Sequence, residues 1–224
     1  MSPSDNLALA KLLQLASPAL PVGAYSYSQG LESAIASGVV KDAGSALTWI
    51  EDVLRLSIAA MEAPLFLRLY KAWRQSEVPE AQRWNELLLA SRESAELRAE
   101  TVQMGYSLAQ LLGELGEAHP FDAWDEVSFP AAFTFCAVRW GIEPQAALVG
   151  YLWSWAENQA VAAMKAVPLG QAAGQRLLSA LSPKLVDCAA RAADIADGEL
   201  SNMAPGLALL SAQHETQYSR LFRS

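Results

Sequence analysis

A carboxylate pair near the end of this 224-residue sequence has the spacing of a cation site. Asp194 and Asp197 are three residues apart, and Glu199 follows them. On a helix such a pair lies on one face, where its oxygens suit a divalent cation such as Mg²⁺. Gly198 and further polar residues surround the pair, however, which is typical of a hydrated helix end. We therefore interpret these residues as a helix end and keep a cation-dependent helical enzyme as an alternative.

Histidine and cysteine provide no clearer reactive centre. The chain has two histidines, His119 and His214, which lie far apart in sequence, and two cysteines, Cys136 and Cys188. No CxxC, HExxH, GxSxG or P-loop motif is present, and both cysteines fall at apolar helical positions. We predict two buried thiols, a solvated His119 and no metal ligands, cofactor or catalytic residues. These residues favour a helical binding protein over an enzyme.

The segment from residue 18 to residue 32 combines helix-breaking residues with tyrosines and polar side chains. Pro18 and Pro21 end the preceding helix, and Gly23 permits a turn with positive φ. Ser26 and Gln29 have the spacing of a capping box, which predicts a helix start at this point. The segment is either a loop-to-helix joint or a partner surface, because tyrosines with polar neighbours suit protein interfaces.

Two later segments have the same mixed character. At Lys165 a helix ends, and the Val167-Pro168 step that follows forces an extended connection. Lys165 either complements the dipole of that helix or faces an acidic partner. The last eleven residues include aromatic and arginine side chains, which are typical of interface anchors. We expect this tail to be mobile without a partner and to become ordered on binding.

The elements that position these segments are helices. Apolar residues recur every three or four positions along almost the whole chain, as in Leu47, Ile50, Leu54, Ile58 and Met61. Sustained alternation of apolar and polar residues, which would indicate strands, is lacking. The pattern predicts an all-α fold, a single domain over residues 1–224 with roughly eight to ten helices. We expect the first five residues and the tail from about residue 212 to 224 to be its mobile parts.

A run of charged residues, from Arg92 through Glu93, Glu96 and Arg98 to Glu100, falls in one of these predicted helices. Arg92 and Glu96 have the i,i+4 spacing of a helical ion pair. The run therefore predicts a solvated helix face on which opposite charges pair.

Composition restricts the function further. The chain has 52% hydrophobic residues, enough for a substantial core, and a net charge of −8. That charge argues against a nucleic-acid-binding protein, which needs a basic face. The uncharged stretch from Leu12 to Leu31 contains two prolines and several polar residues, so we expect neither a membrane span nor an export signal. We predict a cytoplasmic protein.

Four strings, in this order, resemble the UreF family of urease accessory proteins. They are LLQLASPALPVGAYSYSQGLE at 12–32, ASRESAELRAE at 90–100, KAVPLGQAAGQ at 165–175 and HETQYSRLFRS at 214–224. The second string departs from the family pattern, because Ser94 and Ala95 replace a more charged run. The resemblance implies an all-α homodimer that forms a complex with UreD (UreH in some organisms) and the GTPase UreG on apo-urease. It implies a non-catalytic scaffold or modulator for nickel insertion. The alternative is a generic helical adaptor unrelated to urease.

The resemblance also suggests site residues. We expect the 25–32 segment and the 217–224 tail to pack together and form the UreD-facing surface. Its candidate residues are Tyr25, Tyr27, Ser28, Gln29, Glu32, Tyr218, Arg220, Phe222 and Arg223. Lys165 is the candidate for the UreG side.

Overall fold

Prolines and small polar residues begin most of the helices. The computed structural model describes residues 2–224, and α-helices account for most of them. The α-helices are α1 (Pro3–Leu15), α2 (Leu31–Ala36), α3 (Ala43–Val53), α4 (Ala63–Arg74), α5 (Val78–Ala90), α6 (Ala95–Glu114), α7 (Phe129–Arg139), α8 (Pro144–Ala166), α9 (Gln171–Arg191) and α10 (Pro205–His214). Ser2, Asp42, Ser94 and Ser128 each accept a backbone hydrogen bond as N-cap residues. No strand occurs within residues 2–224, so the predicted all-α fold is confirmed.

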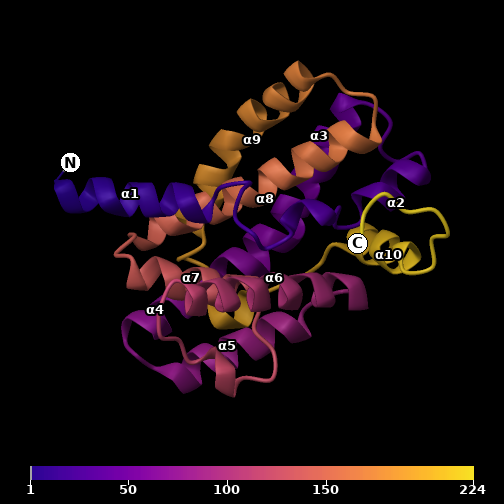
Figure 1. Cartoon of the computed structure of the whole chain (residues 1–224). Helices are drawn as coiled ribbons and strands as arrows, with labels where there is room; N and C mark the ends of the chain where they lie inside the picture. Colours follow the sequence, from indigo (N-terminus) through magenta and orange to yellow (C-terminus); the bar gives the residue numbers. More distant parts are fainter. Residues whose placement is uncertain (1) are drawn as a thin grey trace.

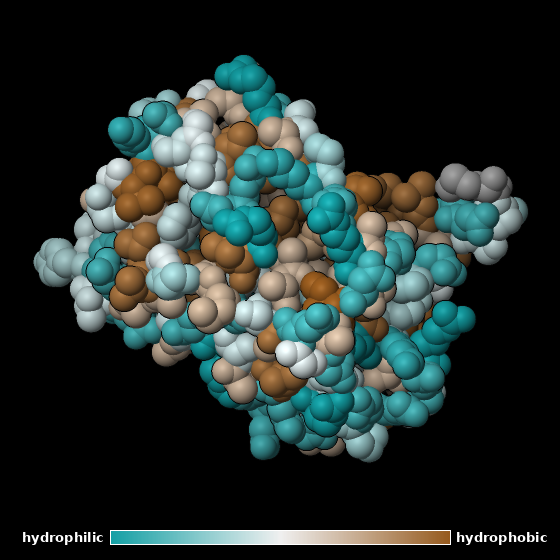
Figure 2. Space-filling model, turned by 180° about the vertical axis from the view of Figure 1, so that it is seen from behind, coloured by the Kyte–Doolittle hydropathy of each residue, from teal (hydrophilic) through white to brown (hydrophobic). Residues whose placement is uncertain are grey.

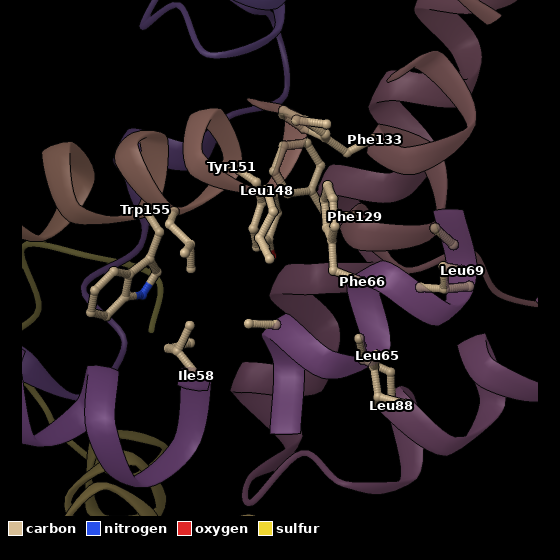
Figure 3. Close-up of a cluster of buried hydrophobic side chains, with 14 of the residues drawn as sticks. Ile58, Leu65, Phe66, Leu69, Leu88, Phe129, Phe133, Leu148, Tyr151 and Trp155 are labelled. Atoms are coloured by element: carbon tan, nitrogen blue, oxygen red, sulfur yellow. The ribbon is translucent and has the colours of Figure 1, made fainter. Parts of the chain in front are cut away.

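The main core lies where α4, α6, α7 and α8 meet (Figure 3). The ring centroids of Phe66 and Tyr151 are 5.0 Å apart, and those of Phe133 and Tyr151 are 5.3 Å apart. Such tilted and edge-to-face contacts add to the stabilisation from burial. α8 also contacts α1, α2 and α9.

A second, smaller apolar cluster lies near the tail. It joins residues from α2, α3, α8, α9, α10, the connections after α2 and α8, and the tail, namely Leu31, Ala34, Val40, Ala46, Ala162, Ala163, Val167, Leu177, Leu210 and Phe222. Figure 1 shows the C-terminal segment beside α2 and α10, while α1 projects from the other side of the molecule. Figure 2 shows apolar side chains on the projecting α1, where Leu7 and Leu13 are more than half exposed.

α3 and α4 are joined without a break by a π-helical segment, Leu54–Glu62. Pro64 lies in the first turn of α4, where proline is tolerated. The wider π turn leaves Glu62 at the segment's end, where its side chain is buried.

Two local predictions were wrong. Ser26 and Gln29 do not form a capping box, because α2 begins at Leu31 and its N-cap is Gly30 at φ 76°. Gln29 has φ 53°, a left-handed conformation that only its tertiary contacts explain. The charged run is not one solvated helix face either, because α6 begins at Ala95 and excludes Arg92. The two cysteines are buried and free, as predicted.

Candidate partner-binding site

The tail and the 25–32 segment lie against each other, as the sequence predicted. The backbone N–H of Arg223 donates to the carbonyl of Ser26 at 2.8 Å. The N–H of Ser28 donates to the carbonyl of Ser224 at 2.7 Å, and the Ser28 hydroxyl donates to the same oxygen at 2.5 Å. These bonds satisfy backbone groups of both segments in a manner that resembles strand pairing over a few residues.

Glu32 anchors the tail from α2. Its carboxylate accepts the backbone N–H groups of two successive residues, Leu221 at 2.6 Å and Phe222 at 2.9 Å. Hydrogen bonds to a charged acceptor in a largely buried place are stronger than neutral ones. Phe222 then inserts its ring into the second apolar cluster, where it is 6% exposed.

His214, at the end of α10, joins the tail to two helices. The ring is fully buried, with Nδ1 2.6 Å from a Glu96 oxygen and Nε2 3.2 Å from a Glu32 oxygen. Glu96 also accepts a hydrogen bond from Arg220 at 2.7 Å. Sequence reasoning missed this cluster, because His214 is separated from Glu32 and Glu96 by more than a hundred residues, and no local spacing indicates the contact.

Below the tail lies a network of buried polar side chains. Glu100 accepts hydrogen bonds from the Gln29 amide at 2.6 Å and from the Ser224 hydroxyl at 2.9 Å. The side-chain amide oxygen of Gln29 in turn accepts a hydrogen bond from the indole N–H of Trp155 at 2.7 Å. Burial raises the pKa of Glu100 to about 7, although both hydrogen bonds oppose that shift. The network explains why Gln29 adopts its left-handed conformation.

A buried ion pair completes the network. Glu62 pairs with Arg92 and also accepts a hydrogen bond from the Tyr151 hydroxyl at 2.5 Å. Burial, followed by the charge of Glu62, raises the pKa of Tyr151. Arg92 thus bonds to the π segment instead of to Glu96. A cavity of about 60 Å³ lies between this pair, Gln29 and Glu100, which is enough space for ordered water.

Exposure divides the candidate residues into two groups. Tyr27, Ser28 and Phe222 are buried in the chain, so their side chains support the surface instead of forming it. Tyr25, Gln29 and Glu32 are partly buried, and the Tyr25 hydroxyl donates to Glu157 at 3.2 Å. The exposed candidates are Tyr218, Arg220 and Arg223, and Leu221 is exposed beside them.

Lys165 lies on the same side of the molecule as the tail. It is an exposed residue in the last turn of α8, and its Nζ is 5.6 Å from the centroid of the Phe222 ring. This distance permits a cation–π contact. The structure therefore brings together two candidates that the sequence assigned to different partners.

The structure does not indicate a metal centre or a membrane helix. Within residues 2–224 no three His, Cys, Asp or Glu side chains are grouped as metal ligands. Asp197 pairs with Arg68 at 2.6 Å, beyond the end of α9 at Arg191. No helix in this described range has the length and apolar character to cross a bilayer.

Comparison with known proteins shows the family. The family model described as UreF matches residues 40–182. A urease accessory protein UreF from Dechloromonas aromatica is 53% identical over 224 residues, which cover 97% of this chain and 98% of that protein. The UreF of Azoarcus sp. is also 53% identical, over 97% of this chain and 96% of its own length, and that of Methylobacillus flagellatus is 50% identical, over 99% and 100%. The alternative of an adaptor from an unrelated family is thereby excluded, and the chain belongs to the UreF family of urease accessory proteins.

Proposed function

We propose that this chain is a non-catalytic, cytoplasmic scaffold that bridges UreD (UreH) and the GTPase UreG on apo-urease during nickel insertion. Nickel is the cargo of the assembly, and we assign no resident metal site to this chain. We propose further that the chain acts as a homodimer. The observation that carries the proposal is the anchored tail, which presents exposed aromatic and cationic side chains from a fixed backbone.

From the sequence we expected a tail that becomes ordered only on binding, but its hydrogen bonds to Glu32 favour a binding surface that is prepared in advance. The side chain of Tyr218 is fully exposed and that of Leu221 is 60% exposed, although Glu32 holds the backbone N–H groups of Leu221 and Phe222. A surface that is ordered before binding loses less conformational entropy when a partner docks. Tyrosine and arginine are also the residue types that most often dominate binding energy at interfaces. We assign this surface to UreD.

Lys165 provides the second contact of the proposal. Its ammonium group is exposed at the end of α8 and faces an aromatic ring of the tail. A lysine in this position suits an acidic patch on a partner, and we assign it to UreG. On this assignment the two partners bind adjacent surfaces, so the scaffold holds them close together.

The proposal is tested by co-purification of the full chain with UreD and with UreG. We expect Arg223→Ala and Tyr27→Ala to reduce recovery of UreD, the first by removing an exposed cation and the second by disturbing the support beneath it. We expect Lys165→Ala to reduce recovery of UreG. Asp194→Asn, which changes an exposed carboxylate outside the tail, is the control. Recovery of both partners at the control level by all three variants would disprove the assignment.

The non-catalytic role is tested separately. Cells that lack this chain are expected to produce urease protein with little activity, and the chain is expected to restore nickel incorporation in them. Normal urease maturation without the chain, or substrate turnover by the purified chain alone, would overturn the proposal.

A further inference from the structure

A second surface, formed by α6 and the connection between α6 and α7, differs from the tail in position and charge. Residues of α6 from Val102 to Gly113 line a hollow of about 540 Å³, together with the connection from His119 to Val127. The tail contacts the same helix at Glu96 and at the buried Glu100. The exposed Tyr106 is six residues beyond Glu100, about 9 Å at the rise of an α-helix, and the tail contacts none of the residues that line the hollow, so the two surfaces are separate.

A smaller hollow meets the first at the segment from Trp124 to Glu126. It has a volume of about 200 Å³ and lies between this segment and α5. Both hollows are lined by Trp124, Asp125 and Glu126, so this segment forms a ridge with space on each side. A volume of several hundred Å³ is sufficient to accept one or more side chains of a ligand.

The connection is held firmly in place. Asn85, which is 1% exposed, donates to the carbonyl of Glu126 at 2.9 Å and accepts the N–H of Ser128 at 2.8 Å. Gly105 allows the connection to lie directly on α6, because a Cβ atom there would be 2.1 Å from the carbonyl oxygen of Val127. The hollows are therefore features of packed backbone and do not depend on a single exposed rotamer.

The lining is acidic and aromatic. Asp122 and Asp125 in the larger hollow and Glu86 in the smaller one are exposed, and none forms an ion pair with any residue from 2 to 224. Arg98 is the single cationic lining residue, and the carboxylate of Glu126 already binds it at 2.5 Å. The charge of the surface is thus negative.

Aromatic side chains form the walls of the larger hollow. Tyr106 is 62% exposed and borders the acidic residues. The His119 ring stacks on Phe121 with centroids 5.4 Å apart. Its Nδ1 atom is buried and has no hydrogen-bond partner among the described residues, so His119 is a partly buried wall of the hollow and not the solvated side chain that we predicted.

We infer that this surface binds a lysine- or arginine-bearing segment of a partner protein. Carboxylates pair with the cationic groups of such a segment, and exposed aromatic faces bind the same groups through cation–π contacts. The proposal goes beyond the scaffold function above and does not depend on it, because it uses neither the tail nor Lys165. It assigns the chain a third contact surface, with a charge opposite to that of the exposed arginines in the tail.

The test uses the full chain and a fluorescent nine-residue peptide in which lysine and arginine alternate with glycine. The control peptide carries glutamate in place of each lysine and arginine. The double variant Asp122→Asn/Asp125→Asn removes two carboxylates of the surface, and Glu77→Gln/Asp194→Asn removes two exposed carboxylates elsewhere as the matched control. Binding is measured by fluorescence anisotropy at low salt, where exposed charge pairs are least screened.

We expect the chain to bind the cationic peptide and not the glutamate peptide. Affinity should fall about two- to thirty-fold in the surface double variant, since each exposed pair contributes modestly, and should stay near wild type in the control. Tyr106→Ala should lower affinity, and Tyr106→Phe should retain it. Carbodiimide cross-links from the peptide lysines should be found at Asp122 or Asp125.

Three outcomes would overturn the inference. One is an equal loss of affinity in the two double variants, which would show attraction to the net negative charge alone. Another is cross-links spread over exposed carboxylates across the chain. The third is displacement of the peptide by an equal concentration of spermidine, which would indicate a site for small cations instead of a protein segment.

Discussion

Glu32 binds the backbone of Phe222 at 2.9 Å, although 190 residues separate them in the sequence. The same carboxylate accepts the N–H of Leu221 and lies against the buried ring of His214. The C-terminal segment is therefore attached to α2 by one acidic side chain, and Phe222 continues the attachment into an apolar cluster shared with α8.

Glu32→Gln should loosen the tail. The amide would place an N–H group opposite a backbone donor, so at least one of the two tail amides would lose its acceptor. We expect faster hydrogen exchange at Leu221 and Phe222 and a free energy of unfolding lower by about 1 to 3 kcal/mol. Glu114→Gln, an exposed carboxylate at the end of α6, is the control. Unchanged exchange at both amides would contradict the anchoring role.

Glu100 should make stability depend on pH. The pKa of Glu100 is about 7 in the folded chain, and that of an ordinary glutamate is 4.5, so between these pH values the folded state keeps a proton that the unfolded state has lost. The free energy of unfolding should therefore fall as pH rises through this window, and this contribution should be constant above it. In urea unfolding, the free energy of unfolding of wild type minus that of Glu100→Gln should decrease by about 2 to 3 kcal/mol from pH 5 to pH 8. A pH-independent difference between wild type and Glu100→Gln would refute the assignment.

Arg92 should stabilise the folded chain mainly because it neutralises the buried carboxylate of Glu62. The two side chains are 12% and 6% exposed, so Arg92→Met leaves a carboxylate without its countercharge in the interior. We expect a loss of about 3 to 5 kcal/mol in the free energy of unfolding. Adding Glu62→Gln should recover part of that loss, because the neutral amide still accepts the Tyr151 hydroxyl. Strictly additive losses in the double variant would argue against a coupled pair.

Gly105→Ala should destabilise the chain through a steric clash with the α6–α7 connection. The added Cβ would be 2.1 Å from the carbonyl oxygen of Val127, so the backbone must shift. We expect a loss of about 1 to 3 kcal/mol, measured as a lower Tm by circular dichroism. Gly113→Ala, on the same helix and with its nearest contact at 3.9 Å, should instead raise stability by about 0.5 to 1 kcal/mol. Equal Tm values for the two variants would show that the close approach is unimportant.

The helical fold followed from the sequence because apolar periodicity is a local signal. Leu54, Ile58 and Met61 are buried as their spacing predicted, yet they lie in a π segment that the same spacing does not distinguish from an α-helix. Contacts between distant residues were predicted less well. Arg92 has Glu96 at an i,i+4 distance, but its partner is Glu62, because α6 starts only at Ala95.

The candidate site was predicted in part for a similar reason. The packing of the tail on the 25–32 segment was expected, from their shared residue types and the family resemblance. The residues that hold the two together were not all found, because Glu96, Glu100 and His214 are polar groups whose burial depends on partners far away in sequence. Their types alone favour a solvated face, and only the tertiary arrangement shows that Glu100 and His214 are buried and Glu96 partly so.

Tyr218 provides the sharpest test of the proposed UreD surface, because nothing in the folded chain depends on its side chain. It is fully exposed, so Tyr218→Ala should change the free energy of unfolding by less than about 0.5 kcal/mol. If the tail is the docking surface, the same substitution should weaken UreD binding about five-fold or more, as expected for an aromatic anchor. Val186→Ala, which removes an exposed apolar side chain from α9, is the matched control. Phe222→Ala should behave differently from both, since loss of a buried ring lowers stability as well as binding. If Tyr218→Ala binds UreD as tightly as Val186→Ala does, Tyr218 lies outside the interface. If UreD binding falls only in variants that also lose folding stability, such as Phe222→Ala, the tail supports the fold and does not dock UreD.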